Sequence, residues 1–145
     1  MANKQVVYVT GKAKWARVFQ DQMDTAYGEK FHITVYPDEA SQIMLKQSGC
    51  QVKPKKDDEG VNYKFSRDNK KEFKPGDIQV LGPPKVLKKE GDEHVFFNER
   101  IGNGSIVTAK IEVYPTQKGM GHRLEAVCVD MHVPYEPGDA GGYKF

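Results

Sequence analysis

The 145-residue sequence predicts a mainly β domain, folded as a small and strongly curved barrel. The main observation is period-two alternation of apolar and polar residues in two long runs, residues 105–113 and 124–133. A Gly-containing turn separates the runs, which predicts an antiparallel hairpin. Glycines flank both strands at places where a coiled sheet bends or bulges, namely Gly102, Gly104, Gly119 and Gly121.

The remaining elements follow from similar patterns. Residues 6–19 alternate as a first strand, and residues 31–36 alternate as a second strand that ends at Pro37. Asp38 is placed to cap a short helix with apolar residues at helical spacing, and Gly49 is placed to end it. This is the one helix that the sequence predicts.

The second half begins with a long basic excursion, residues 51–84, dense in lysine, aspartate, glycine and proline. Residues 61–67 alternate within it and predict a third strand, and residues 85–89 and 93–97 predict a hairpin. Residues 134–145 hold too few apolar side chains to pack and predict a flexible tail. The expected organisation is one domain, residues 1–133, followed by the tail.

Composition and motifs narrow the function classes. No apolar run approaches the roughly 20 residues of a membrane span, and the N-terminus leads into no signal-peptide core, so we expect a cytoplasmic protein without membrane contact. Cys50 and Cys128 lie far apart and predict free thiols. The four histidines show no metal-ligand spacing, and the common nucleophile and phosphate-loop motifs are missing. We therefore expect no enzyme, no metal and no cofactor.

The net charge of +2 hides an uneven distribution. Residues 1–20 carry four basic side chains and no acid, and residues 51–74 carry eight basic side chains against five acids. After residue 124 the acids outnumber the bases. Basic segments in a near-neutral chain are compatible with a polyanion held in a local groove, although charge runs more often mark a solvated face.

Aromatic residues interleave with basic ones in three of these segments, around Trp15, around Tyr63 and Phe65, and around Phe73. Rings stack on bases while Lys and Arg follow phosphates, and each stack contributes about 1–3 kcal/mol. Core packing is the competing interpretation for these rings; for Tyr63 and Phe65 we predict the binding face. The predicted nucleic-acid-binding residues are Lys12, Lys14, Trp15, Arg17, Lys53, Tyr63, Lys64, Phe65, Arg67 and Phe73.

Four segments, residues 11–19, 29–37, 101–113 and 121–127, resemble in order and spacing the single-stranded DNA-binding proteins of tailed bacteriophages. The resemblance spans residues 6–133. It implies a five-stranded OB-fold barrel with one short helix and a long basic loop and strand excursion. It also implies that the concave face binds single strands with little sequence preference, during phage DNA replication and recombination in the infected host cell.

The sequence departs from that family in two places. The predicted helix follows the second strand, whereas the common OB order places it between strands three and four. Many family members end in an acidic tail that recruits replication proteins, but here Phe145 follows Lys144 and only Glu136 and Asp139 lie nearby. Contact with phage or host replication proteins through the tail is a further expectation, and the oligomeric state stays open.

Two alternatives remain beside single-stranded DNA binding. One is an RNA-binding or structural phage protein on the same barrel. The other is a small metal-dependent hydrolase that uses a histidine and a carboxylate such as Glu93.

Overall fold

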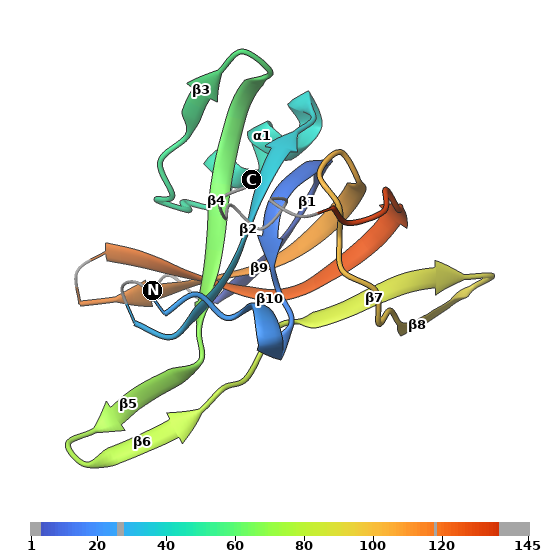
Figure 1. Ribbon diagram of the computed structural model, residues 1–145. Coiled ribbons are helices and arrows are strands. Elements are labelled where there is room, and N and C mark those ends of the chain that lie inside the picture. The colour runs from blue at the N-terminus through green and yellow to red at the C-terminus, as the bar shows by residue number, and fades with distance from the viewer. Residues whose placement is uncertain (1–3, 26–27, 118, 137–145) are drawn as a thin grey trace.

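The computed structural model of the chain describes residues 4–25, 28–117 and 119–136, except for the side chains of residues 72–74 (Figure 1). Its helical elements are the 3-10 turn Gln20–Gln22 and the helix α1, Glu39–Gln47. The strands are β1 Gln5–Arg17, β2 Lys30–Pro37, β3 Lys55–Asp57, β4 Gly60–Asp68, β5 Lys70–Lys74, β6 Asp77–Val80, β7 Lys85–Glu90, β8 Glu93–Phe96, β9 Ile106–Thr116 and β10 Gly119–Met131. The prediction of a mainly β protein is confirmed.

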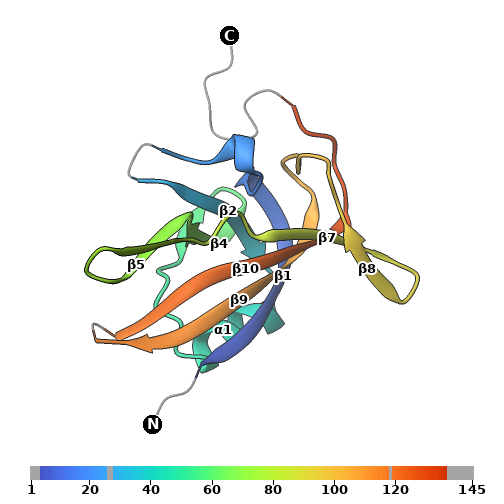
Figure 2. The same cartoon turned by 90° about the horizontal axis from the view of Figure 1, so that it is seen from below.

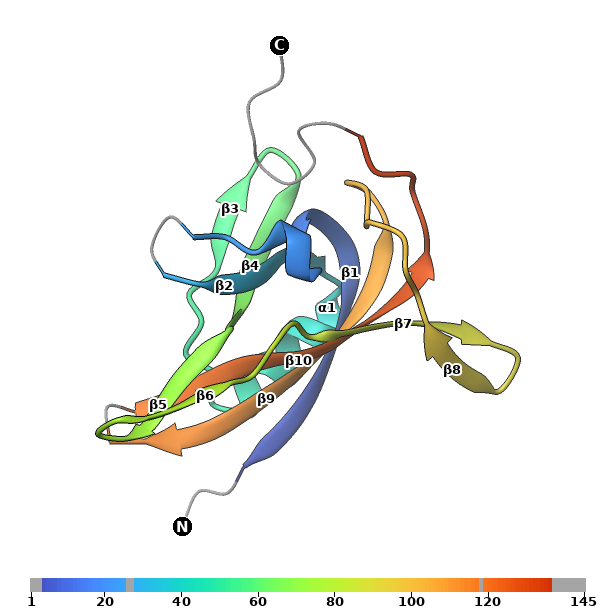
Figure 3. The same ribbon diagram turned by 60° about the horizontal axis from the view of Figure 1, so that its bottom comes forward.

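Eight of the strands form one mixed sheet in the order β3-β4-β2-β1-β9-β10-β7-β8. Neighbours in this sheet are antiparallel, except that β7 runs parallel to β10. Strands β5 and β6 form a separate hairpin. The β5–β6 and β7–β8 hairpins extend to opposite sides of the molecule (Figures 2 and 3). The basic excursion therefore contains three short strands, β3, β5 and β6, that the sequence did not indicate.

Strand β1 connects the two halves of the sheet. Residues 5–12 pair with β9, and the part from Gly11 onward pairs with β2. The strand crosses from one partner to the other at Gly11, where an added Cβ would lie 2.0 Å from the carbonyl oxygen of Tyr36. Only glycine permits this approach, as expected where two backbones meet closely in a bent strand.

The sheet curls until β10 lies against β4, but side chains make the contact there. The backbone N–H of Ser66 donates to His122 Nε2 at 3.1 Å, and the guanidinium of Arg67 lies 3.5 Å from the Glu125 carboxylate. The prediction of a five-stranded barrel is thus wrong in strand number and in closure. Residues 126–129 of β10 use their outer backbone groups to pair with the added strand β7, so the stretch around residues 122–125 is left to meet β4, and it does so through the side chains of His122 and Glu125.

The core lies inside the curl and draws on the five longest strands, β1, β2, β4, β9 and β10. Its fully buried large side chains are Val9, Val18, Phe31, Ile33, Val35, Phe65, Ile101, Val107, Ile111, Val113, Leu124 and Val127. The predicted inward face of residues 105–113 is confirmed, since all of its apolar members are buried. In β10 a register shift between Leu124 and Ala126 turns Leu124 inward as well, which simple alternation does not allow.

Helix α1 forms as predicted. The Asp38 carboxylate accepts from the backbone N–H of Ser41 at 2.8 Å, and Gly49 follows the helix with φ of 79°. The helix packs against β1, where Ser41 Oγ accepts from the backbone N–H of Thr10 at 2.9 Å. Its place directly after β2 confirms the departure from the common OB order.

The described helices include none that is long and apolar enough to cross a membrane. Cys50 and Cys128 are free thiols, as predicted. Of the predicted tail, Pro134 forms a bridge with Ile101, and the ring of Tyr135 lies 5.4 Å from the Arg100 guanidinium carbon. Residues 137–145, with Asp139, Lys144 and Phe145, lie outside the described residues, so the flexible tail stays a prediction.

The contact between His122 and Ser66 predicts a pH dependence of stability. Burial lowers the pKa of His122 below the ordinary 6.5. The unfolded chain therefore binds the proton first as the pH falls, so the stability present above about pH 6.5 is lost below it. We expect the melting temperature to fall between about pH 7.5 and 5.5, and to fall less in His122→Gln. Thermal melts of both proteins across this range measure the effect.

His32, whose pKa burial also lowers, remains in both proteins, so the difference between them isolates His122. Identical pH profiles would show that His122 does not carry the effect.

Candidate nucleic-acid interface

The first candidate surface is the outer face of β1 and β2 beyond the bend at Gly11. Lys12 lies opposite Tyr36 in the strand register, and Lys14 lies opposite Thr34. The ammonium groups of Lys12 and Lys14 lie 5.9 and 5.6 Å from the centre of the Tyr36 ring, within cation–π range. Burial, with a hydrogen bond to Asp57, raises the pKa of Tyr36 to about 12, so its hydroxyl stays protonated near neutral pH. We call Lys12, Lys14, Trp15 and Tyr36 the β1–β2 cationic face.

Trp15 belongs to this face because of a β-bulge. The register shifts between Lys14 and Arg17, and Trp15 has φ of 52°, a left-handed conformation that is rare for a bulky residue. Asn103 Oδ1 accepts from the Trp15 backbone N–H at 2.8 Å. The bulge puts Ala16 into the core, leaving the indole 37% exposed, with the Lys14 ammonium 5.4 Å from its ring. Such strain costs on the order of 1–3 kcal/mol and is most often found at functional sites.

An acidic turn, residues 57–59, reaches the β1–β2 cationic face from the junction of β3 and β4. The Glu59 carboxylate forms ion pairs with both Lys12 and Lys14. Next to it, Asp57 accepts a 2.5 Å hydrogen bond from the Tyr36 hydroxyl. The two lysines are thereby held over the sheet, with a protein carboxylate between them.

The second candidate surface is the Tyr114 cluster, made of Tyr114, Lys71 and Arg123. The Lys71 ammonium lies 5.2 Å from the Tyr114 ring centre, and the Arg123 guanidinium carbon lies 5.3 Å from it. Glu112 and Glu125 each place a carboxylate oxygen 3.9 Å from Arg123, which helps to orient it. The cluster thus offers an aromatic ring flanked by two cations.

A shallow depression continues from the Tyr114 cluster across β2 and β4. One pocket beside Tyr114 is lined by Lys30, Ser66, Arg67, Asp68, Lys71, Leu81, His122 and Arg123. The next pocket is lined by Asp24, Gly28, Lys30, His32, Lys64 and Ser66, so the two share Lys30 and Ser66. Cationic side chains therefore follow one path from Lys64 to Tyr114.

The rings predicted to form the binding face are in the core. Phe65 has no exposed surface and Tyr63 is 5% exposed, and the two rings stack with centres 6.0 Å apart. The prediction that they stack on bases is wrong, because this side of β4 faces the inside of the curled sheet. Lys64, between them, points outward and lines the depression.

The other predicted residues differ in their surroundings. Arg67 donates from Nε to the carbonyl oxygen of Gly82 at 2.9 Å and from a terminal nitrogen to that of Leu81 at 3.0 Å. These contacts fix the chain after β6, and they engage the guanidinium of Arg67, a predicted nucleic-acid-binding residue, with protein carbonyl groups. Arg17 donates to the carbonyl oxygen of Gln22 at 3.1 Å. Lys53 is exposed before β3, and the side chain of Phe73 lies outside the described part of the chain.

Sequence reasoning missed Tyr36 and Tyr114, because their cations come from other strands. The hairpin register offered a signal for Tyr114, which lies opposite Gly121, two residues from Arg123. In an antiparallel pair such diagonal neighbours are within reach of long side chains. Counting back from the predicted turn would have placed these two side chains together.

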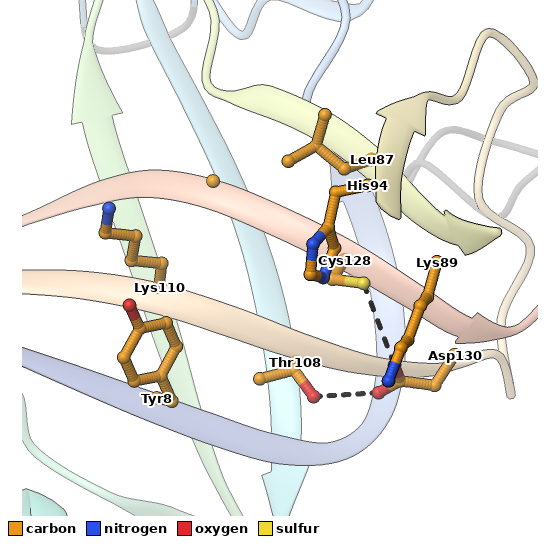
Figure 4. Close-up of a pocket in the computed structure, with 9 residues that line it drawn as sticks. Tyr8, Leu87, Lys89, His94, Thr108, Lys110, Cys128 and Asp130 are labelled. Carbon is orange, nitrogen blue, oxygen red and sulfur yellow. Dashed lines mark hydrogen bonds between the residues drawn. The ribbon is translucent and has the colours of Figure 1, made fainter. Parts of the chain in front are cut away.

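A larger groove of about 380 Å³ lies over β1, β9, β10 and the β7–β8 hairpin. Tyr8 and Lys110 lie at one end, and Lys89, His94, Cys128 and Asp130 at the other (Figure 4). The Asp130 carboxylate accepts from the Thr108 hydroxyl at 2.7 Å inside the groove. The groove holds Lys89 and Lys110 beside this carboxylate. The path from Lys64 to Tyr114 holds Lys30, Lys64, Lys71 and Arg123 beside Asp24 and Asp68, so it offers the longer row of cations to a polyanion. Among the described residues, no three His, Cys, Asp or Glu side chains gather as a metal site.

No protein-family model matches the chain, and no curated protein matches it in sequence. In structure it is similar to gp2.5, a single-stranded DNA-binding protein encoded by bacteriophage T7. The two chains share a fold. The TM-score is 0.54 and the identity 16%, and the match covers 98% of this chain and 99% of the other. At the level of the fold, this confirms the resemblance to phage single-stranded DNA-binding proteins identified from the sequence.

Burial of the β4 rings predicts a large loss of stability for one substitution and almost none for its neighbour. Phe65→Ala opens a cavity in the core and should lower the free energy of unfolding by about 3–5 kcal/mol. Lys64→Ala, on the outer side of the same strand, should change it by less than about 0.5 kcal/mol. Denaturant unfolding measures both. Equal, small effects would mean that Phe65 is exposed in solution.

Proposed function

We propose that this protein binds single-stranded DNA with little sequence preference and has no catalytic role. The observation that carries the proposal is the cationic path from Lys64 to Tyr114, which ends in a ring held between Lys71 and Arg123. Cations can follow a phosphate backbone, while aromatic faces stack on any base. The β1–β2 cationic face supplies a second exposed ring, Trp15, beside Lys12 and Lys14, whereas Tyr36 is 9% exposed and lies under the two lysines.

The strand arrangement supports the same proposal. We assign the five long strands β1, β2, β4, β9 and β10 to an OB-fold whose closure is left to side chains. OB-folds bind oligonucleotides on the face of their second and third strands and on the loops that join strands one to two and four to five. By this assignment the depression lies on β2 and β4, and Tyr114 lies beside the turn between β9 and β10.

The setting we propose is the cytoplasm of an infected host cell, where the protein would coat strands exposed during phage replication and recombination. Phage or host replication proteins are proposed as partners through the tail. Single strands in such a setting vary in sequence. A site of rings and lysines suits them, because it makes no demand on base identity.

Titration with oligo-dT tests the function, using the fluorescence of Trp15, the one tryptophan in the chain. If the path holds about four to six phosphates, the log–log salt slope should be roughly −3 to −4. Affinity should then fall about a hundredfold between about 50 and 200 mM salt. An affinity that does not change with salt concentration would contradict the role of the cationic path. Tighter binding to oligo-U than to oligo-dT would favour the RNA-binding alternative.

A matched pair of tyrosine substitutions tests the location of the site. Tyr114→Ala should weaken oligo-dT binding by about 1–3 kcal/mol, which corresponds to about 5- to 150-fold, because one stacking platform is lost. Tyr8→Ala removes a 53% exposed tyrosine from the larger groove, which lies over β1, β9, β10 and the β7–β8 hairpin, and should leave the affinity unchanged. Dissociation constants and melting temperatures of both variants measure this. The reverse pattern would place the strand in that groove.

A further inference from the structure

The ion pairs of Glu59 place a protein anion on the β1–β2 cationic face. One carboxylate oxygen contacts Lys12 and the other contacts Lys14. Both lysines also lie within 6 Å of the Tyr36 ring centre, and Lys14 lies 5.4 Å from the ring of Trp15. Two cations beside the exposed ring of Trp15 form an arrangement suited to a phosphate and its adjoining base. A backbone phosphate also presents two non-bridging oxygens, which share its negative charge.

The turn that carries Glu59 is held by a few local contacts. The backbone N–H of Glu59 donates to Asp57 Oδ1 at 2.8 Å, and Asp57 Oδ2 accepts from Tyr36. Strand β3 has three exposed residues and pairs with β4 at one end of the sheet. Segments with little buried surface at a sheet edge open at low free-energy cost. The turn can therefore leave Lys12 and Lys14 while the core stays folded.

We propose that Glu59 is an internal competitor of the DNA backbone, whose carboxylate occupies a phosphate site formed by Lys12 and Lys14. This inference rests on the proposed function and adds a residue that sets its affinity and selectivity. A free phosphate that displaces Glu59 exchanges one anion for another and gains little. A DNA strand makes the same exchange and also stacks a base on Trp15, so the competitor favours strands over small anions.

The exchange has a signature in the salt dependence. A phosphate that binds solvated lysines adds to the salt slope, by about 0.7 for each single-strand contact. At Lys12 and Lys14 the incoming phosphate must break the ion pairs with Glu59, and salt weakens these pairs too, which offsets part of the slope. Neutralising Glu59 should restore the missing part of the slope.

Glu59→Gln is the test, with Asp58→Asn as its matched control. Each removes one negative charge from the same exposed turn, but it is Glu59 that forms the two ion pairs. At about 50 mM salt we expect Glu59→Gln to bind oligo-dT about 3- to 10-fold more tightly, in line with the modest strength of exposed ion pairs. Its log–log salt slope should be steeper by about 0.7, while Asp58→Asn stays within about twofold of the wild-type affinity with an unchanged slope.

A second arm introduces Lys12→Gln and Lys14→Gln together in the same chain. In this background Glu59→Gln should give no gain, because the site that it uncovers is gone. Melting temperatures of all variants show that each one is folded at the titration temperature.

The outcomes separate the two proposals. If wild type binds oligo-dT and Glu59→Gln binds with the same affinity and slope, the competitor is overturned while the function stands. Equal gains in Glu59→Gln and Asp58→Asn would also overturn it, since general charge would explain them. If no variant binds, the proposed function fails, and the competitor fails with it.

Discussion

The close approach of two backbones at Gly11 is the constraint on which the structure depends. It lets β1 cross from β9 to β2, with no room for a side chain beside Tyr36. The two halves of the sheet then face each other around one core, and β10 meets β4. The same bend divides the outer side of β1. Tyr8, before the bend, lines the groove over β9 and β10, whereas Lys12 and Lys14, beyond it, lie over β2. One strand thus supplies two chemically different surfaces.

Most of the fold could be predicted because its signals are local. Alternation marked the five long strands, and Asp38 and Gly49 marked the ends of the helix. Bulges were not predictable in this way, since a single extra residue reverses the face of every residue after it. The reversal at Trp15 and Ala16 is the clearest case, because strict alternation would have put the indole where Ala16 packs. Whether the sheet closes into a barrel was not predictable either, because it depends on which strand β7 pairs with.

The candidate site was predicted where its residues are neighbours in sequence. Lys12, Lys14 and Trp15 lie close together along β1 and form a surface group in the structure. The polar sequence around Phe65 suggested exposure, but the burial of that ring is decided by strands packed around it from distant parts of the chain. Glu59 counted only as one charge among many until the fold placed it between two lysines. Contacts between strands that no predicted turn joins, such as those of Glu59 with β1, leave no trace in a single sequence.

The order of the strands also determines how copies of the protein can meet. The eight-stranded sheet ends at β3 on one side and at β8 on the other, strands of three and four residues. Strand β3 carries three charged side chains, whereas β8 begins with Glu93 and ends with the exposed Phe96. Short edge strands offer few backbone groups for pairing with another chain, which limits edge-to-edge association. Molecules crowded side by side could therefore stay separate instead of joining into one continuous sheet.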